Sequence, residues 1–136
     1  MSERKERTER EPSKQQQARR AARELAVQGI YQWQMTGKNM TTIEAEFRGQ
    51  KVDDDVELHE NWVEVMRIAD QALFHELLHN VPRFQKELDA SISPLLDRRL
   101  QDLDEIELAI LRLGAYELSK RMEVPYRVAI NEGVEL

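Results

Sequence analysis

Five consecutive residues have a spacing that suits metal chemistry: His75-Glu76-Leu77-Leu78-His79 matches the pattern H-E-x-x-H. On an α-helix the two histidines lie one turn apart on the same face. There they can share a zinc ion, with Glu76 as general base. The motif therefore makes a zinc hydrolase one hypothesis for this chain.

The sequence offers no clear third ligand for such an ion. The remaining histidine, His59, lies roughly 24 Å away along the same predicted helix, from the rise per residue. Glu87 and Asp97 are alternatives that no pattern singles out. We therefore interpret the two motif histidines as surface residues beside an apolar stripe containing Leu77 and Leu78. We predict no metal, no cofactor and no enzymatic activity, with the zinc hydrolase as a minor alternative.

A second group of residues suits the binding of phosphate. Arg19, Arg20 and Arg23 lie in the first two turns of an amphipathic helix predicted from Ala18 to about Met35. Cations at the amino end of a helix oppose its dipole, and a bound phosphate would compensate them. A solvated basic turn is the alternative interpretation.

The charge of the chain is divided unevenly. Residues 1–23 carry eight Lys or Arg and four Glu, a net charge of +4, whereas the whole chain of 136 residues has a net charge of −6. The remaining 113 residues therefore carry −10. Nucleic acid could bind the basic arm, but the acidic body would repel it.

The elements that must position these residues are all predicted to be helical, because no segment alternates polar and apolar residues as a strand does. We expect residues 1–17 to be a disordered polar extension. A short helix with Thr41 and Glu44 as its cap comes next, followed by a loop over residues 48–55. One long helix should run from about residue 56 to 90, with a kink or break near His79 caused by Pro82.

The stretch Asp104–Leu136 is predicted to hold the central helix of a bundle, since apolar residues mark two of its sides. Asp104 is the expected N-cap, with Glu107 completing the capping pattern. Gly114 lies inside the helix, which predicts close approach of another backbone. A short helix begun by Ser93 and Pro94 should precede it.

Composition and length limit the classes of protein to which the chain can belong. The chain has no cysteine and no apolar run that could cross a membrane, so we expect a cytoplasmic protein without disulfides. Its length fits one domain or two small helical lobes.

Two stretches resemble the NusB family of bacterial transcription antitermination factors. One is E-L-A-I-L-R-L-G-A-Y-E-L-S-K-R at residues 107–121, followed by V-P-Y-R-V-A-I-N-E-G-V-E-L at 124–136. The other is A-R-R-A-A-R-E-L-A-V-Q-G-I-Y-Q-W-Q at residues 18–34. They occur in the family's order, and H-E-x-x-H is not part of the family's pattern.

The resemblance implies an all-α fold of two small helical bundles, one over residues 18–90 and one over 91–136. It implies binding of boxA RNA in nascent ribosomal transcripts, together with NusE, a small-subunit ribosomal protein, in the transcription elongation complex. Arg19, Arg20, Arg23 and Arg112 match RNA-contacting positions of the family, and Tyr31 and Glu107 match positions near NusE. A homodimer is an alternative assembly.

The chain also departs from the family. It has a longer polar amino-terminal extension and a longer acidic loop near Asp53, and the family continues by about one helix beyond Leu136. We therefore expect the carboxy-terminal helix of the family to be missing here. Two further readings stay open: the RNA-binding domain that precedes some ribosomal RNA methyltransferases, and a helical adaptor without an RNA role.

Overall fold

The computed structural model describes residues 12–49 and 60–120, and these residues are helical without any strand. The expected all-α class is thereby confirmed. Six α-helices and two 3-10 turns follow one another in this part of the chain: α2 Lys14–Thr36, α3 Met40–Phe47, α4 Glu60–Ile68, α5 Gln71–Arg83, α6 Gln85–Ile92, η1 Ser93–Leu95, η2 Leu100–Asp102 and α7 Glu105–Lys120.

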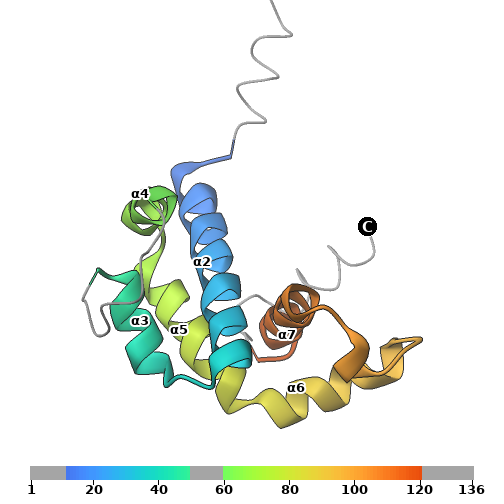
Figure 1. The fold of residues 1–136 in the computed structure, drawn as a ribbon. Helices are drawn as coiled ribbons and strands as arrows, with labels where there is room; N and C mark the ends of the chain where they lie inside the picture. Colours follow the sequence, from blue (N-terminus) through green and yellow to red (C-terminus); the bar gives the residue numbers. More distant parts are fainter. Residues whose placement is uncertain (1–11, 50–59, 121–136) are drawn as a thin grey trace, which may run out of the picture.

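Helix α2 is the element around which the others are arranged. It packs against α3, α4 and α5 on one side and against α7 on the other (Figure 1). The central position was predicted for the helix that follows Asp104, so this prediction was wrong. On α7, Leu111 and Leu118, both in one of the two predicted apolar stripes, are exposed. Its carboxy-terminal continuation lies outside the described residues.

Helix α2 begins earlier than its apolar spacing predicts. Ser13 is the N-cap, with its Oγ accepting from the amide of Gln16 at 3.1 Å and its own amide donating to Oε1 of Gln16 at 2.9 Å. This reciprocal cap satisfies two backbone donors and starts the helix at Lys14. Residues 14–17 are therefore ordered helix, although we expected them to be disordered.

The single helix predicted over residues 56–90 is three helices in the part that is described. Asp70 caps α5, its Oδ1 accepting from the amide of Leu73 at 3.0 Å, and so separates α5 from α4. Pro82 lies in the last turn of α5, and the chain turns at Phe84 rather than near His79. The amide of Phe84 donates to the carbonyl of Asn80 at 3.0 Å, so the last turn of α5 keeps this backbone hydrogen bond despite Pro82.

The structure also differs from two predictions of local structure. The N-cap of α3 is Asn39, whose Oδ1 accepts from the amide of Thr41 at 2.7 Å, and not Thr41 itself. The segment that Ser93 and Pro94 begin is a 3-10 turn, and its Leu95 is exposed. Asp104 does cap α7, with Oδ1 accepting from the amide of Ile106 at 2.8 Å.

One hydrophobic core joins the two halves of the chain. Its side chains from α2 are mostly small, and Ala109, Leu113 and Tyr116 of α7 belong to the same cluster as Phe74 and Leu77 of α5. Phe47 and Phe74 meet edge to face at 5.7 Å between ring centroids.

A tight contact in this core lies at Gly29, in the middle of α2. A Cβ placed there would clash with Cδ1 of Leu78 and lie 3.5 Å from Cγ2 of Ile43. Among the described residues, nothing lies within 4 Å of a Cβ built at Gly114, so the close approach predicted at that glycine is not found.

We predict opposite effects for alanine at these two glycines. Gly29→Ala overpacks the interface of α2 and α5 and should lower the free energy of unfolding by about 1–3 kcal/mol. Gly114→Ala is the matched control and should raise it by up to about 1 kcal/mol through helix propensity. Urea denaturation followed by circular dichroism measures both, and equal effects at the two positions would contradict the packing described here.

Candidate nucleic-acid interface

The amino end of α2 is the positive end of a helix, and its first turn holds no acidic side chain. The cap of α2 is made by the neutral side chains of Ser13 and Gln16. The amino end of a helix carries a partial positive charge that favours anions. This end of α2 is therefore electrostatically suited to an anionic partner.

Two of the arginines predicted to bind phosphate are exposed to solvent on this part of the helix. Arg19 and Arg20 are exposed, and neither forms an ion pair with any residue in the ranges 12–49 and 60–120. Ala21 and Ala22, which follow them directly, are buried in the core. The backbone that carries the two arginines is thus fixed by packing, and no carboxylate in the described part of the chain occupies their guanidinium groups.

Arg23 lies beside them on the helix surface, because residues three and four apart are neighbours. Its Nε and Nη2 donate to the two carboxylate oxygens of Glu117 on α7, at 2.8 and 3.1 Å. The Arg23 side chain remains 43% exposed. Arg23 therefore joins α2 to α7 while part of its side chain still faces solvent with Arg19 and Arg20. We call these three residues the arginine face.

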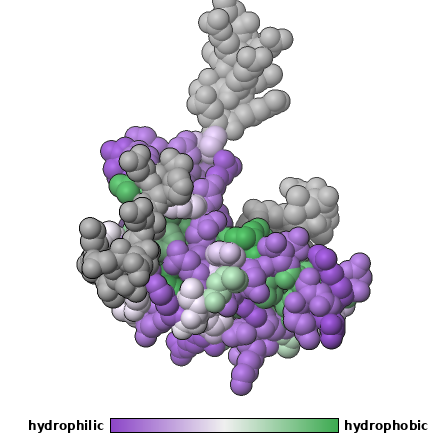
Figure 2. All heavy atoms as spheres, in the orientation of Figure 1, coloured by the Kyte–Doolittle hydropathy of each residue, from purple (hydrophilic) through white to green (hydrophobic). Residues whose placement is uncertain are grey.

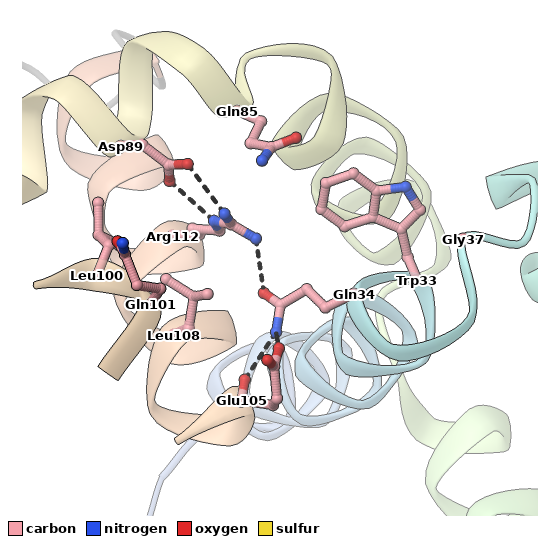
Figure 3. Close-up of a pocket in the computed structure, with 10 residues that line it drawn as sticks. All are labelled: Trp33, Gln34, Gly37, Gln85, Asp89, Leu100, Gln101, Glu105, Leu108 and Arg112. Atoms are coloured by element: carbon pink, nitrogen blue, oxygen red, sulfur yellow. Dashed lines mark hydrogen bonds and ion pairs between the residues drawn. The ribbon is translucent and has the colours of Figure 1, made fainter. Parts of the chain in front are cut away.

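Arg112 lies elsewhere, on α7, where it lines a pocket between α2, α6 and α7 (Figure 3). Its Nε and Nη2 each donate to a carboxylate oxygen of Asp89 at 2.9 Å. Its Nη1 donates to Oε1 of Gln34 at 3.1 Å, and Gln34 in turn donates to the backbone carbonyl of Glu105 at 2.8 Å. The guanidinium carbon also lies 5.8 Å from the centre of the Trp33 ring.

These contacts change the interpretation of Arg112. The residue is only 7% exposed, and its guanidinium is committed to partners on α6 and α2. The sequence resemblance grouped it with the RNA-contacting arginines, and that role stays a prediction. The structure shows its guanidinium joining α7 to α6 and α2.

The residues matched to the partner surface lie on two helices. Tyr31 of α2 is half-buried against the core, and Glu107 is exposed at the start of α7, where it pairs with Arg98 at 3.1 Å. Ile110, Leu111 and Leu118 of α7 are exposed as well. The view in Figure 2 is mostly hydrophilic, with hydrophobic atoms gathered around α7.

The geometry of the histidine motif does not support hydrolysis. Oε2 of Glu76, the presumed general base, accepts a hydrogen bond from the Tyr116 hydroxyl at 2.9 Å and so is directed toward α7. Of the third ligands considered from the sequence, Glu87 pairs with Lys120 instead. Leu77 and Leu78 are fully buried, as predicted for the stripe beside the histidines.

We predict that Arg112→Ala destabilises the fold by about 3 kcal/mol, because it leaves the Asp89 carboxylate partly buried without its partner. The matched control is Arg99→Ala, which removes an arginine paired with Asp102 at the surface and should cost less than about 1 kcal/mol. Chemical denaturation compares the two variants. A cost for Arg112→Ala as small as that of the control would show that the buried network contributes little.

Comparison with known proteins gives one consistent result. The family model described as "NusB family" matches residues 20–136. A Transcription antitermination protein NusB from Chromohalobacter salexigens is 69% identical over 95% of this chain and 78% of its own length. Proteins of the same name from Hahella chejuensis and Pseudomonas fluorescens are 47% and 48% identical, over 74% and 63% of their own lengths.

No helix in the described part of the chain is both long and apolar enough to span a bilayer. The names of these relatives denote transcription antitermination proteins, in line with the prediction that the chain is not an enzyme. With a family match over residues 20–136 and relatives up to 69% identical among those compared, the chain belongs to the NusB family.

Proposed function

We propose that this chain is a transcription antitermination factor that binds boxA RNA of nascent ribosomal transcripts together with NusE. In this proposal it acts in the cytoplasm as part of the transcription elongation complex. The observation that carries the proposal is the pair of exposed arginines, Arg19 and Arg20, which have no ion pair within residues 12–49 and 60–120 and lie on a helix whose first turn contains no acidic residue.

The arginine face suits single-stranded RNA better than a small anion. Three guanidinium groups within two helical turns can follow successive phosphates, and the phosphate contacts fix the register in which bases are read. Arg23, partly balanced by Glu117, would contribute less charge than Arg19 or Arg20. The arginines would hold the RNA backbone in place, and other groups beside the arginine face would contact the bases.

The net charge of the chain and the exposed side chains of α7 indicate what kind of partner would bind. Because residues 24–136 carry a net charge of −10, this chain alone should bind RNA weakly, and a basic partner would add attraction. The exposed Ile110, Leu111 and Leu118, with Glu107 beside them, form an apolar surface with an acidic edge. Such a surface fits a basic ribosomal protein such as NusE, with Tyr31 as a further candidate contact.

The alternative is the RNA-binding domain of a ribosomal RNA methyltransferase. The relatives reported above are named antitermination proteins, which favours the first proposal. Both proposals use the same arginine face, so the partner distinguishes them.

We expect Arg19→Ala and Arg20→Ala each to weaken boxA binding by about tenfold, the effect of losing one charge-assisted hydrogen bond. Each loss should also flatten the plot of log affinity against log salt by about 0.7, the value for one phosphate contact on a single strand. Fluorescence anisotropy with labelled boxA RNA and a scrambled RNA, between about 50 and 200 mM salt, measures both quantities.

The control is Arg67→Ala, which removes an arginine that lies on α4 and is paired with Glu64. Its RNA affinity and salt slope should equal those of the unchanged chain. If Arg19→Ala and Arg20→Ala behave like this control, the arginine face is not the RNA site.

For the partner, we predict that Leu111→Ser together with Leu118→Ser abolishes co-purification with NusE, because two exposed apolar contacts are lost. Binding of RNA by the variant alone should be unchanged. Undiminished co-purification would place the partner on another surface.

A further inference from the structure

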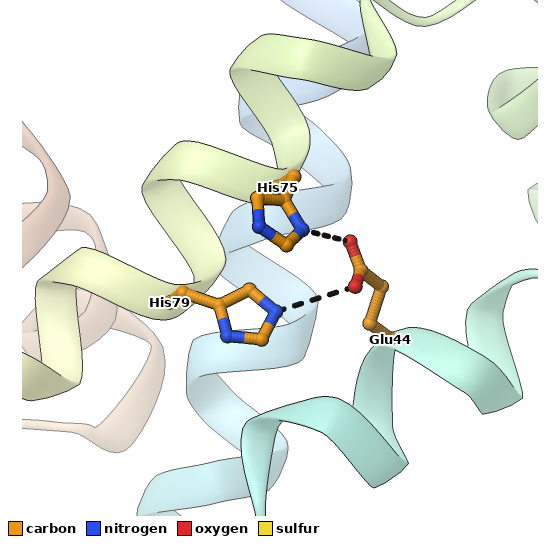
Figure 4. A group of neighbouring side chains, drawn as sticks. All are labelled: Glu44, His75 and His79. Carbon is orange, nitrogen blue, oxygen red and sulfur yellow. Dashed lines mark hydrogen bonds and ion pairs between the residues drawn. The ribbon is translucent and has the colours of Figure 1, made fainter.

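Three side chains of types that can ligate a metal ion lie together on the side of α5 that faces α3. Glu44 projects from α3 between His75 and His79 of α5 (Figure 4). Nδ1 of His75 lies 2.7 Å from Oε1 of Glu44, and Nε2 of His79 lies 3.2 Å from Oε2. One ligand atom from each residue can be chosen so that all three lie within 4.8 Å of one another.

We propose that Glu44, His75 and His79 bind one zinc ion that links α3 to α5. This site does not depend on the RNA-binding proposal, since it lies outside the arginine face. The sequence alone gave two ligands one helical turn apart, and the fold supplies the third from a different helix.

The distances allow a zinc ion to enter with small side-chain movements. A tetrahedral ion with bonds of about 2.0–2.2 Å holds its ligand atoms roughly 3.3–3.6 Å apart. The two imidazole rings are already close, with centroids 4.2 Å apart. His75 is 59% exposed and His79 26% exposed in their side chains, so an ion can reach the site from solvent.

The donor set selects the kind of metal. Two imidazoles and one carboxylate suit zinc and its neighbours in the transition series, whereas magnesium prefers oxygen ligands alone. Three protein ligands leave one tetrahedral position for water. Glu76, the general base of the H-E-x-x-H pattern, accepts from Tyr116 instead, so within the described residues the pattern supplies no base to that water, and we assign the ion a structural role.

The charged and polar groups around the Glu44 carboxylate have two opposite effects on the affinity for zinc. Burial raises the pKa of this carboxyl, but hydrogen bonds with His75, His79 and Arg48 outweigh burial and hold the pKa below its usual value. A carboxylate that is already ionised is the form that a metal binds. Arg48, whose Nη2 lies 3.2 Å from Oε1, is a cation beside the site and should reduce affinity for zinc without blocking Oε2.

Isothermal titration calorimetry of the full chain with zinc chloride tests the proposal directly. We expect saturable binding of one zinc ion per chain and a rise of several degrees in the midpoint of thermal unfolding. Magnesium chloride should produce neither effect. Absence of saturable zinc binding by the unchanged chain would overturn the proposal.

Variants then identify the ligands. His75→Ala and His79→Ala should each abolish stoichiometric binding, and Glu44→Gln should weaken it by at least about tenfold, the effect of losing even an outer-shell partner. His59→Ala is the matched control and should bind zinc like the unchanged chain. Circular dichroism confirms that each variant is folded. Zinc binding retained by the double variant of His75 and His79 would place the ion elsewhere and overturn the assignment.

Discussion

The structure depends on the close packing of α2 against helices from both halves of the chain. Small residues make this possible: Ala21, Ala22, Ala26 and Gly29 are buried along α2, and at Gly29 there is no room even for a methyl group. A helix lined with small side chains lets neighbouring backbones approach it closely. The position of the arginine face is therefore fixed by apolar contacts on the other sides of the same helix.

Three arginines that look equivalent in the sequence have different physical roles. Arg20 is exposed and unpaired within the described ranges, Arg23 is shared between solvent and Glu117, and Arg112 is buried against Asp89. Burial decides the difference, because a guanidinium removed from water needs carboxylate and amide partners for its donors. Arg23 and Arg112 both connect α7 to other helices, and the ion pair of Arg23 with Glu117 belongs to the proposed RNA site itself.

Much of the fold could be predicted from local patterns. Helical periodicity gave the all-α class and the apolar stripe that contains Leu77 and Leu78, and the capping pattern gave the cap at Asp104. The boundary at Asp70 was missed because the apolar stripe continues across it, although an aspartate before a helical run is a capping signal. The capping box of Ser13 and Gln16 was missed because polar residues around it indicated disorder.

Tertiary contacts could not be predicted in the same way. The burial of Arg112 depends on Asp89 and Gln34, which are 23 and 78 residues away in sequence. The approach of Glu44 to the two histidines joins residues 31 and 35 positions apart. No periodicity in one helix reports on a partner from another helix, so these two groups became visible only in the folded chain.

We propose that Arg19 and Arg20 contact RNA directly, whereas the guanidinium of Arg112 is held by Asp89 and Gln34. Nuclear magnetic resonance of the arginine Nε–Hε groups during titration with boxA RNA tests it most directly. The account predicts large shifts for Arg19 and Arg20, a smaller shift for Arg23 and almost none for Arg112. Unchanged signals from Arg19 and Arg20 at RNA saturation, or a dominant shift at Arg112, would contradict it.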